Sequence, residues 1–292
     1  MTENRILNIG FIGFGLIGGS IAKAIKKKHP EYIITVASRS QAPLFAAVND
    51  GIVDNVRTQP DDSFSDCDYI FLCTPVVTIT KYLAQLKVLA KPGCIITDAG
   101  SVKGYIHRAV SELEMDDMFI GGHPMTGSEL SGYANSNAEL LKDAKYVITP
   151  TEKTSKEQLS AYASLVEDMG AVPVVMDYRL HDYTVAGISH VPHLIAAALT
   201  RTVQKYDDSE GHMHLLAAGG FRDTTRIAAS SPEMWTQICD ANRDAICDIL
   251  DKYISEMQDI KKHIAAGKNN ADDMREFIEK LFTDAGSYRN SF

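Results

Sequence analysis

The chain has 292 residues and a formal net charge of −9, with 45% hydrophobic and 23% charged residues. This length favours two domains, because a domain usually holds about 150 residues, and the composition is that of a globular chain rather than a disordered one. The negative charge argues against a protein that neutralises nucleic-acid phosphates, so no nucleic-acid partner is expected and an anionic substrate would need a local cationic pocket.

The cysteines and the apolar runs indicate in which cellular compartment the protein works. Five cysteines form no C-x-x-C pair, and their number is odd, which favours reduced thiols in a cytoplasmic protein. A lysine cluster follows the first apolar run, whereas a signal peptide places its positive charge first. No stretch of 18 apolar residues occurs, so we expect a soluble chain without membrane contact.

Short β-branched runs alternate with helical stretches in the first part of the chain. The predicted strands cover residues 6–12, 33–37, 69–72, 94–97, 119–121, 145–148 and 172–176. Alternation of this kind predicts an α/β domain over residues 1–176, with a mainly parallel, doubly wound sheet and helices on both faces.

After residue 176 the pattern becomes helical. Helical spacing is found over residues 181–206, 211–229, 232–266 and 270–284, and Pro232 after two serines is typical of a helix start. We therefore expect an all-helical domain over residues 177–292. No linker rich in Gly, Pro or Ser separates the two parts, which favours tight packing between them.

A glycine-rich turn follows the first predicted strand and opens a predicted helix. It has the G-x-G-x-x-G pattern and consists of Gly13, Phe14, Gly15, Leu16, Ile17 and Gly18. The first glycine permits the tight turn, the second lets the backbone approach a pyrophosphate, and the third lets the helix lie close to the strand. The helix N-terminus then binds the anion. This context predicts a Rossmann-type domain that binds NAD or NADP.

The end of the second predicted strand favours NADP over NAD. About 20 residues after such glycines an acidic residue usually binds the ribose 2′-hydroxyl, but this chain has Ser38, Arg39 and Ser40 there. An arginine between two hydroxyls suits a 2′-phosphate. If Arg39 instead stacks on the adenine or points to solvent, NAD binds as well. Thr74 and Pro75 follow the third predicted strand and should flank the dinucleotide.

Two polar motifs follow later strands. Ser101 lies in D-A-G-S-V-K, where it is a candidate helix cap, substrate ligand or both. His123 lies in G-G-H-P-M-T-G-S-E, between two glycines and a proline at a strand end. A histidine that faces the cofactor crevice there is a candidate general base at neutral pH.

Two further motifs lie in the helical part. His190 and His193 lie one helical turn apart in S-H-V-P-H-L, but no carboxylate accompanies them at helical spacing, so we predict no metal site. Arg226 lies in F-R-D-T-T-R-I-A among apolar residues, where its charge needs a partner. A substrate carboxylate and Asp223 are the two candidates.

In this order, from G-F-G-L-I-G to F-R-D-T-T-R-I-A and M-W, the motifs resemble the prephenate/arogenate dehydrogenase family of tyrosine biosynthesis over nearly the whole chain. The resemblance implies a nucleotide-binding domain, a helical dimerisation domain and hence a homodimer, and oxidative decarboxylation of a cyclohexadienyl substrate. It implies that His123 is the catalytic base that takes the proton of the ring hydroxyl, and that Ser101 binds the same hydroxyl and orients His123. It also implies that His190 and Arg226 bind substrate. We also assign Ser128 and Glu129 to substrate binding.

Two alternatives share the cofactor turn. A β-hydroxyacid or imine-type dehydrogenase predicts a catalytic lysine in the helical domain, and residues 185–199 contain none. A non-enzymatic NADP sensor does not need His123, Ser101 and Arg226 together. Prephenate and arogenate differ only by a keto or an amino group on the side chain. Glu129 or Asp223 could pair with the amine of arogenate, which is a weak argument for that substrate.

Overall fold

The computed structural model describes residues 5–40, 42–127 and 130–292. The chain divides into two compact units, Met1–Arg243 and Asp244–Phe292, and each is described by itself. In the described residues, no helix combines the length and the apolar character that a membrane span requires.

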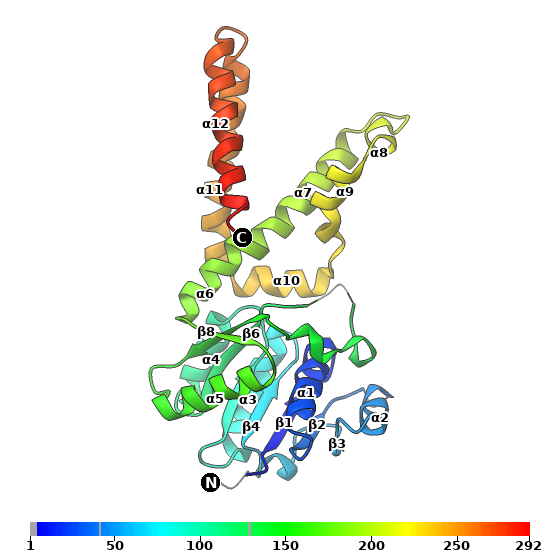
Figure 1. The fold of residues 1–292 in the computed structure, drawn as a ribbon, viewed down its shortest axis with the longest axis vertical. Helices are drawn as coiled ribbons and strands as arrows, with labels where there is room; N and C mark the ends of the chain where they lie inside the picture. The colour runs from blue at the N-terminus through cyan, green and yellow to red at the C-terminus, as the bar shows by residue number, and fades with distance from the viewer. Residues whose placement is uncertain (1–4, 41, 128–129) are drawn as a thin grey trace. The chain divides into compact units, whose positions relative to one another are not determined.

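The first unit contains one eight-stranded sheet with the order β3-β2-β1-β4-β5-β6-β7-β8 (Figure 1). Its strands are β1 Asn8–Ile12, β2 Ile33–Ala37, β3 Asn55–Arg57, β4 Tyr69–Leu72, β5 Ile95–Asp98, β6 Phe119–Pro124, β7 Lys145–Pro150 and β8 Val172–Val175. All neighbours pair in parallel except β6 and β7. The mainly parallel sheet is thus confirmed. Edge strand β3 was not predicted, because three residues with one apolar side chain carry no periodic signal.

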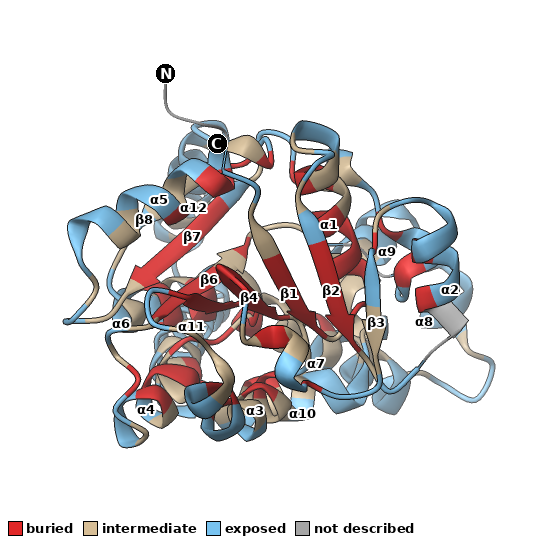
Figure 2. Ribbon diagram, turned by 90° about the horizontal axis from the view of Figure 1, so that it is seen from below, coloured by how far each residue is buried: buried red, intermediate tan, exposed pale blue. Residues whose placement is uncertain are grey.

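Helices cover both faces of the sheet, as predicted. Two separate clusters of buried apolar side chains, one on each face, hold them there. On one face lie α1 Leu16–Lys28, α2 Ala42–Asn49 and α5 Lys156–Asp168, and on the other α3 Val76–Leu89 and α4 Gly104–Glu112. Figure 2 shows the central strands buried between these layers. The short helices η1 Asp62–Phe64, η2 Tyr133–Asn135 and η3 Ala138–Leu140 lie in the connections.

The rest of the first unit is helical. It contains α6 Tyr178–Val185, the π-helix η4 Ala186–His190, α7 Val191–Tyr206, α8 His212–Leu215, α9 Gly219–Thr225, η5 Arg226–Ala229 and α10 Pro232–Ala241. Ser231 caps α10 by accepting a hydrogen bond from the Met234 N–H, which confirms the predicted helix start. No described residue after 176 lies in a strand.

The predicted single helix over residues 232–266 is interrupted at Asn242. This residue ends α10 with φ −120° and ψ 32°, and α11 Arg243–Ala266 follows. Asn242 is buried, and its side chain donates to the Asp182 carbonyl oxygen over 2.8 Å. The amide thus bonds a neighbouring helix, and this tertiary contact is one that helical periodicity does not encode.

The second unit is a hairpin of α11 and α12 Ala271–Arg289. The ring of His263 on α11 stacks on Phe277 of α12 with the centroids 3.8 Å apart. Asn270 caps α12 by accepting from the Asp273 N–H. The hairpin exposes several large apolar side chains, among them Ile254, Met257, Ile264 and Phe282.

Candidate active site

The glycine turn has the geometry that a dinucleotide needs. Gly13 has φ +86°, and a Cβ there would lie 2.8 Å from the Cys73 carbonyl oxygen. A Cβ on Gly18 would lie 2.9 Å from the Gly13 carbonyl oxygen, so α1 can approach the strand ends this closely only without a side chain. At Gly15, directly before α1, a Cβ would meet no described atom within 4 Å. An anion thus has access to the backbone N–H groups of the helix N-terminus.

One cavity of about 490 Å³ is lined by six of the predicted cofactor residues, of which Gly13 alone comes from the glycine turn. It is lined by Gly13, Ser38, Arg39, Ser40, Thr74 and Pro75, together with Ala37, Cys73, Thr78 and Tyr82. None of these described lining residues is acidic. The Thr74 hydroxyl is buried without a hydrogen-bond partner among the described residues, and buried polar atoms are normally bonded. The residues present therefore fit a polar, anionic ligand such as a dinucleotide.

A buried ion pair lies at the carboxyl ends of β5 and β6. Lys103 is fully buried, and its ammonium group contacts the carboxylate of Asp98, also fully buried. The same ammonium donates to the Gly122 carbonyl oxygen over 2.6 Å, and Asp98 accepts from the Gly122 N–H over 3.2 Å. Burial raises the pKa of Asp98 and lowers the pKa of Lys103, while their mutual contact opposes both shifts. The pair fixes the backbone immediately before His123.

The close packing around this backbone leaves no room for a side chain at residue 122. A Cβ on Gly122 would lie 2.6 Å from the Asp98 carbonyl oxygen and 2.7 Å from the Tyr162 hydroxyl. These distances are shorter than carbon and oxygen atoms tolerate without a shift. Strand β6 can therefore pack this closely only because position 122 is glycine.

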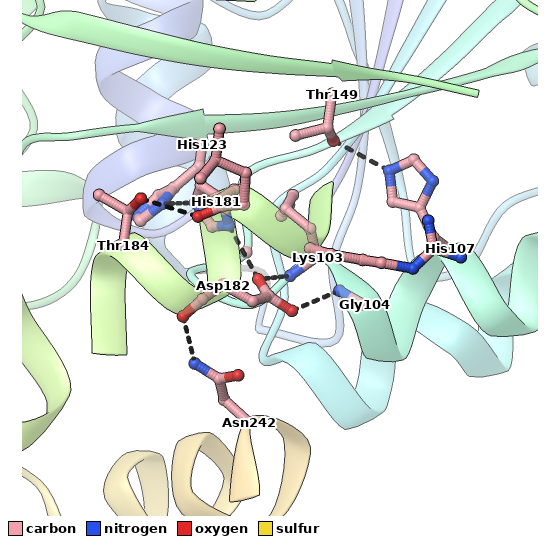
Figure 3. A network of polar contacts seen from close by, with 12 residues as sticks. Lys103, Gly104, His107, His123, Thr149, His181, Asp182, Thr184 and Asn242 are labelled. Atoms are coloured by element: carbon pink, nitrogen blue, oxygen red, sulfur yellow. Dashed lines mark hydrogen bonds and ion pairs between the residues drawn. The ribbon is translucent and has the colours of Figure 1, made fainter. Parts of the chain in front are cut away.

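His123 lies at the end of β6 and contacts a second histidine. Its Nδ1 lies 2.9 Å from Nε2 of His181 on α6, and Nδ1 of His181 lies 2.8 Å from the Asp182 carboxylate. Figure 3 shows these residues converging with the start of α4. Burial lowers the pKa of His123 well below its usual value, and nearby His181, Lys103 and His190 lower it further. The ring is therefore neutral at pH 7, as a base must be.

His190 lies on the π-helix η4 and is fixed from two sides. Asn242 Nδ2 lies 3.1 Å from its Nδ1, and the ring packs edge-on against Trp235 with centroids 6.0 Å apart. Burial lowers the pKa of His190 to about 4. Because the amide N–H donates to Nδ1, a neutral His190 carries its proton on Nε2, where it can donate to a ligand. A π-helix widens the turn and is frequent at functional sites.

The structure places the remaining predicted residues separately. Ser101 lies in the bend between β5 and α4, and no hydrogen bond between described residues joins it to His123. Arg226 lies in η5, which packs against α7. Ser128 and Glu129 lie outside the described residues. The structure thus connects His123 and His190 through His181, Asp182 and Asn242. It shows no direct hydrogen bond from either histidine to Ser101 among the described residues.

The interpretation of Ser101 as a helix cap is wrong. Helix α4 begins at Gly104, and Lys103 occupies the cap position. The carboxylate of Asp182 accepts from the Lys103 and Gly104 N–H groups over 2.8 and 2.7 Å. A side chain from α6, 78 residues along the chain from Gly104, therefore caps this helix, and a cap so distant leaves no local sequence signal.

Sequence reasoning missed the buried partners of the site. Asp98 and Lys103 lie on either side of Ser101 within the D-A-G-S-V-K motif. The available signal for an ion pair was that these opposite charges are five residues apart, with a bend between them. His181 and Asp182 are adjacent at the start of the helical part. An acidic residue next to a histidine is common, so only the structure shows that the two bond each other.

The comparisons with known proteins agree over most of the chain. Residues 21–175 match the model described as prephenate dehydrogenase, nucleotide-binding domain, and residues 177–281 match prephenate dehydrogenase, dimerization domain. The chain is 37% identical to prephenate dehydrogenase of Bacillus subtilis (strain 168), over 86% of this chain and 68% of that protein.

Two solved structures share the fold. One is prephenate dehydrogenase from A. aeolicus in complex with hydroxyphenyl propionate and NAD+, with a TM-score of 0.90 and 29% identity over 98% of this chain and 100% of that one. The other is Synechocystis arogenate dehydrogenase, with a TM-score of 0.84 and 31% identity over 97% of this chain and 100% of that one. Together with the geometry of the cofactor turn, these matches show that the chain belongs to the prephenate dehydrogenase family of oxidoreductases.

Proposed function

We propose that this protein catalyses oxidative decarboxylation of prephenate, arogenate or both, with hydride transfer to NAD(P). The observation that carries the proposal is the state of His123. The ring lies at the carboxyl edge of the sheet that also carries the cofactor turn, is neutral at pH 7, and has its Nδ1 bonded to His181. Its Nε2 is thus left to act on a substrate.

The reaction follows from a base, an anion clamp and a bound cofactor. When bound, the nicotinamide supplies the hydride acceptor. His123 takes the proton of the ring hydroxyl at Nε2 as hydride leaves the carbon that bears this hydroxyl. The ring carboxylate leaves as carbon dioxide, the electron pair of the broken C–C bond completes the aromatic ring, and His123 returns its proton to the phenolate oxygen. Prephenate then yields 4-hydroxyphenylpyruvate, and arogenate yields tyrosine.

The substrate contacts are part of the proposal. We assign Ser101 to the ring hydroxyl and His190 and Arg226 to substrate binding, with Ser128 and Glu129 as further ligands. His190 supports this role because its Nε2–H is available as a donor. The similarity to the A. aeolicus and Synechocystis enzymes supports both a prephenate and an arogenate substrate.

The assay that tests the function is formation of reduced cofactor from prephenate and from arogenate. It should be measured at 340 nm on one preparation with both NAD and NADP. We expect turnover of at least one of the two substrates, with a phenolic product. Turnover of a β-hydroxyacid and of neither cyclohexadienyl compound would contradict the proposal.

Replacing Arg226 by alanine should raise KM for the substrate by about tenfold to a hundredfold, with a smaller effect on kcat. The reason is that a charge-assisted hydrogen bond to a carboxylate contributes about 1.5–3 kcal/mol. The measurement is steady-state kinetics at saturating cofactor. An unchanged KM would mean that Arg226 serves Asp223 and not the substrate.

We further propose that NADP is the preferred cofactor and that NAD is a possible one. Arg39 and its neighbouring serines line the cavity without an acidic residue, which suits a 2′-phosphate. The NAD+ bound in the A. aeolicus structure is a reason to test both. Arg39→Ala should raise KM for NADP by about tenfold or more, because a charge-assisted bond is lost, and should leave KM for NAD nearly unchanged. A wild-type kcat/KM tenfold higher with NAD would contradict the preference.

The division into residues 1–176 and 177–292 and the homodimer are also proposals. The two family models meet at residues 175 and 177, and the second is described as a dimerization domain. Large exposed apolar side chains on the helices, such as Leu199, Leu215 and Phe282, support a second copy as partner. A cytoplasmic location is supported by the unpaired state of all five cysteines.

A further inference from the structure

A chain of three side chains begins at the proposed base and ends on a carboxylate. His123 Nδ1 lies 2.9 Å from His181 Nε2, and His181 Nδ1 lies 2.8 Å from Asp182 Oδ1. His181 is 1% exposed, so these two contacts are made in an environment that excludes most solvent. Figure 3 shows the connection running from the strand of His123 into α6.

The position of Asp182 is fixed independently of the histidines. Its two carboxylate oxygens accept from the Lys103 and Gly104 N–H groups at the start of α4. Its own carbonyl oxygen accepts from the Asn242 side chain. A carboxylate held by this many donors cannot turn away from His181, and the N-terminus of α4 favours its negative charge.

These contacts determine where the protons lie. A carboxylate only accepts, so His181 must carry a proton on Nδ1. A neutral His181 then has an unprotonated Nε2, which accepts the Nδ1–H of His123. His123 consequently has an unprotonated Nε2, the atom that a general base requires. Without His181, the free imidazole ring has no such preference for Nδ1–H.

The charged and titratable groups around His181 come from several elements. Asp98 at the end of β5 and Lys103 at the start of α4 form an ion pair near the two histidines. His190 lies nearby on η4, and Asp182 lies on α6 next to His181 itself. If Nε2 of His181 carried a proton, it would donate to Nδ1 of His123, and a neutral His123 would then carry its own proton on Nε2, which would remove the base. Among the described residues, the carboxylate that bonds this pair is that of Asp182, which contacts Nδ1 of His181 and not the Nε2 that faces His123.

We propose that His181 and Asp182 form a relay that fixes the proton of His123 on Nδ1 and takes up charge when the substrate proton arrives. As Nε2 of His123 gains this proton, its Nδ1–H bond to His181 strengthens, and the positive charge is shared with a ring that already faces Asp182. When the phenolate takes the proton back, the relay returns to its starting state, so no proton is lost. The inference rests on the proposed function, since it assumes that His123 is the base.

Two variants of His181 separate the relay from a structural role. His181→Gln keeps an oxygen near the position of Nε2 that accepts from His123, whereas His181→Leu keeps the volume and removes the acceptor. We expect His181→Leu to lower kcat by about a hundredfold to a thousandfold, below the loss of about 10⁴-fold for the wrong tautomer in a Ser-His-Asp triad. His181→Gln should remain within about tenfold of the wild type. KM should change little in both.

The control is His107→Gln. His107 is also a buried histidine near the joint between sheet and helices, where it lies 2.9 Å from the Thr149 hydroxyl and stacks on Tyr178. It makes no hydrogen bond to His123 or His181 among the described residues. The loss of a buried polar ring is therefore matched, and kcat per folded molecule should stay within about twofold of the wild type.

A spectroscopic readout tests the proton positions directly. In protein labelled with ¹⁵N-histidine, the rings of His123 and His181 should both show protonated Nδ1 and bare Nε2 at pH 7, with assignments from the variants. In His181→Leu the His123 ring should lose this state. A wild-type His123 with its proton on Nε2, or equal kcat values for His181→Leu and wild type, would overturn the relay. If instead His123→Asn retains turnover, the assignment of His123 as the base fails, and if the wild type turns over neither prephenate nor arogenate, the proposed function fails, so each failure is distinguishable from that of the relay.

Discussion

Replacing His123 by asparagine should lower kcat by about two to four orders of magnitude, the usual contribution of a general base. Asparagine is short enough to leave the fold of β6 intact, and its amide lies near the position of Nδ1, where it can still contact His181. It has no atom at the position of Nε2. Steady-state and single-turnover kinetics with prephenate should therefore show a chemical step that has become slow, with a modest change in KM.

The pH dependence of the wild type checks the same assignment. The pKa of His123 is lowered well below its ordinary value, chiefly by burial, so the base is unprotonated at pH 7 and gains a proton only in more acidic solution. The acidic limb of kcat/KM should accordingly lie below pH 6.5, the ordinary value for histidine. Near-normal turnover in His123→Asn, or an acidic limb above pH 7, would contradict the assignment.

Replacing Lys103 by methionine should destabilise the fold by about 3–5 kcal/mol, the cost of leaving one partner of a buried ion pair alone. Lys103 and Asp98 are both fully buried, and the ammonium also bonds Gly122. The variant leaves an uncompensated carboxylate and an unpaired carbonyl oxygen in a low-dielectric environment. Urea unfolding, followed by circular dichroism at pH 7, measures the loss as a lower midpoint with an unchanged slope.

Two controls show whether burial is the cause. Lys91→Met removes a lysine that pairs with Asp68 over 2.8 Å but is partly exposed, and pairs of that kind contribute about 0–1 kcal/mol. The double variant Asp98→Asn/Lys103→Met removes both charges and should recover part of the loss. If Lys103→Met costs no more than Lys91→Met, the buried pair does not stabilise the backbone before His123.

The elements that could be predicted from the sequence are those with a periodic or local signal. Seven strands and the change to helices after residue 176 follow from hydrophobic spacing, and the cofactor turn follows from three glycines between a strand and a helix. Ser231 before Pro232 indicated a helix start because the serine side chain bonds an N–H group in the first turn of the helix that follows it. In each case the information lies within a few residues.

The parts that could not be predicted depend on contacts between distant segments. Asp182 caps α4, which begins 78 residues earlier in the sequence. Asn242 lies between α10 and α11 and bonds α6, and His181 contacts a histidine 58 residues away in sequence. The motif around His123 pointed to the proposed base but not to the side chains that contact its ring. The residues proposed to contact a ligand lie in recognisable motifs, whereas those proposed to position them are dispersed along the sequence.

The glycine at position 122 limits how this enzyme can be redesigned. Any side chain there would displace the strand that carries His123, so a library that varies this position should retain almost only glycine. The helices α6 and α10 and the π-helix η4 also contribute side chains around the site, among them His181, Trp235 and His190. Attempts to change which cyclohexadienyl compound is accepted should therefore keep the strand as it is and vary positions of these helices other than His181, Asp182 and His190.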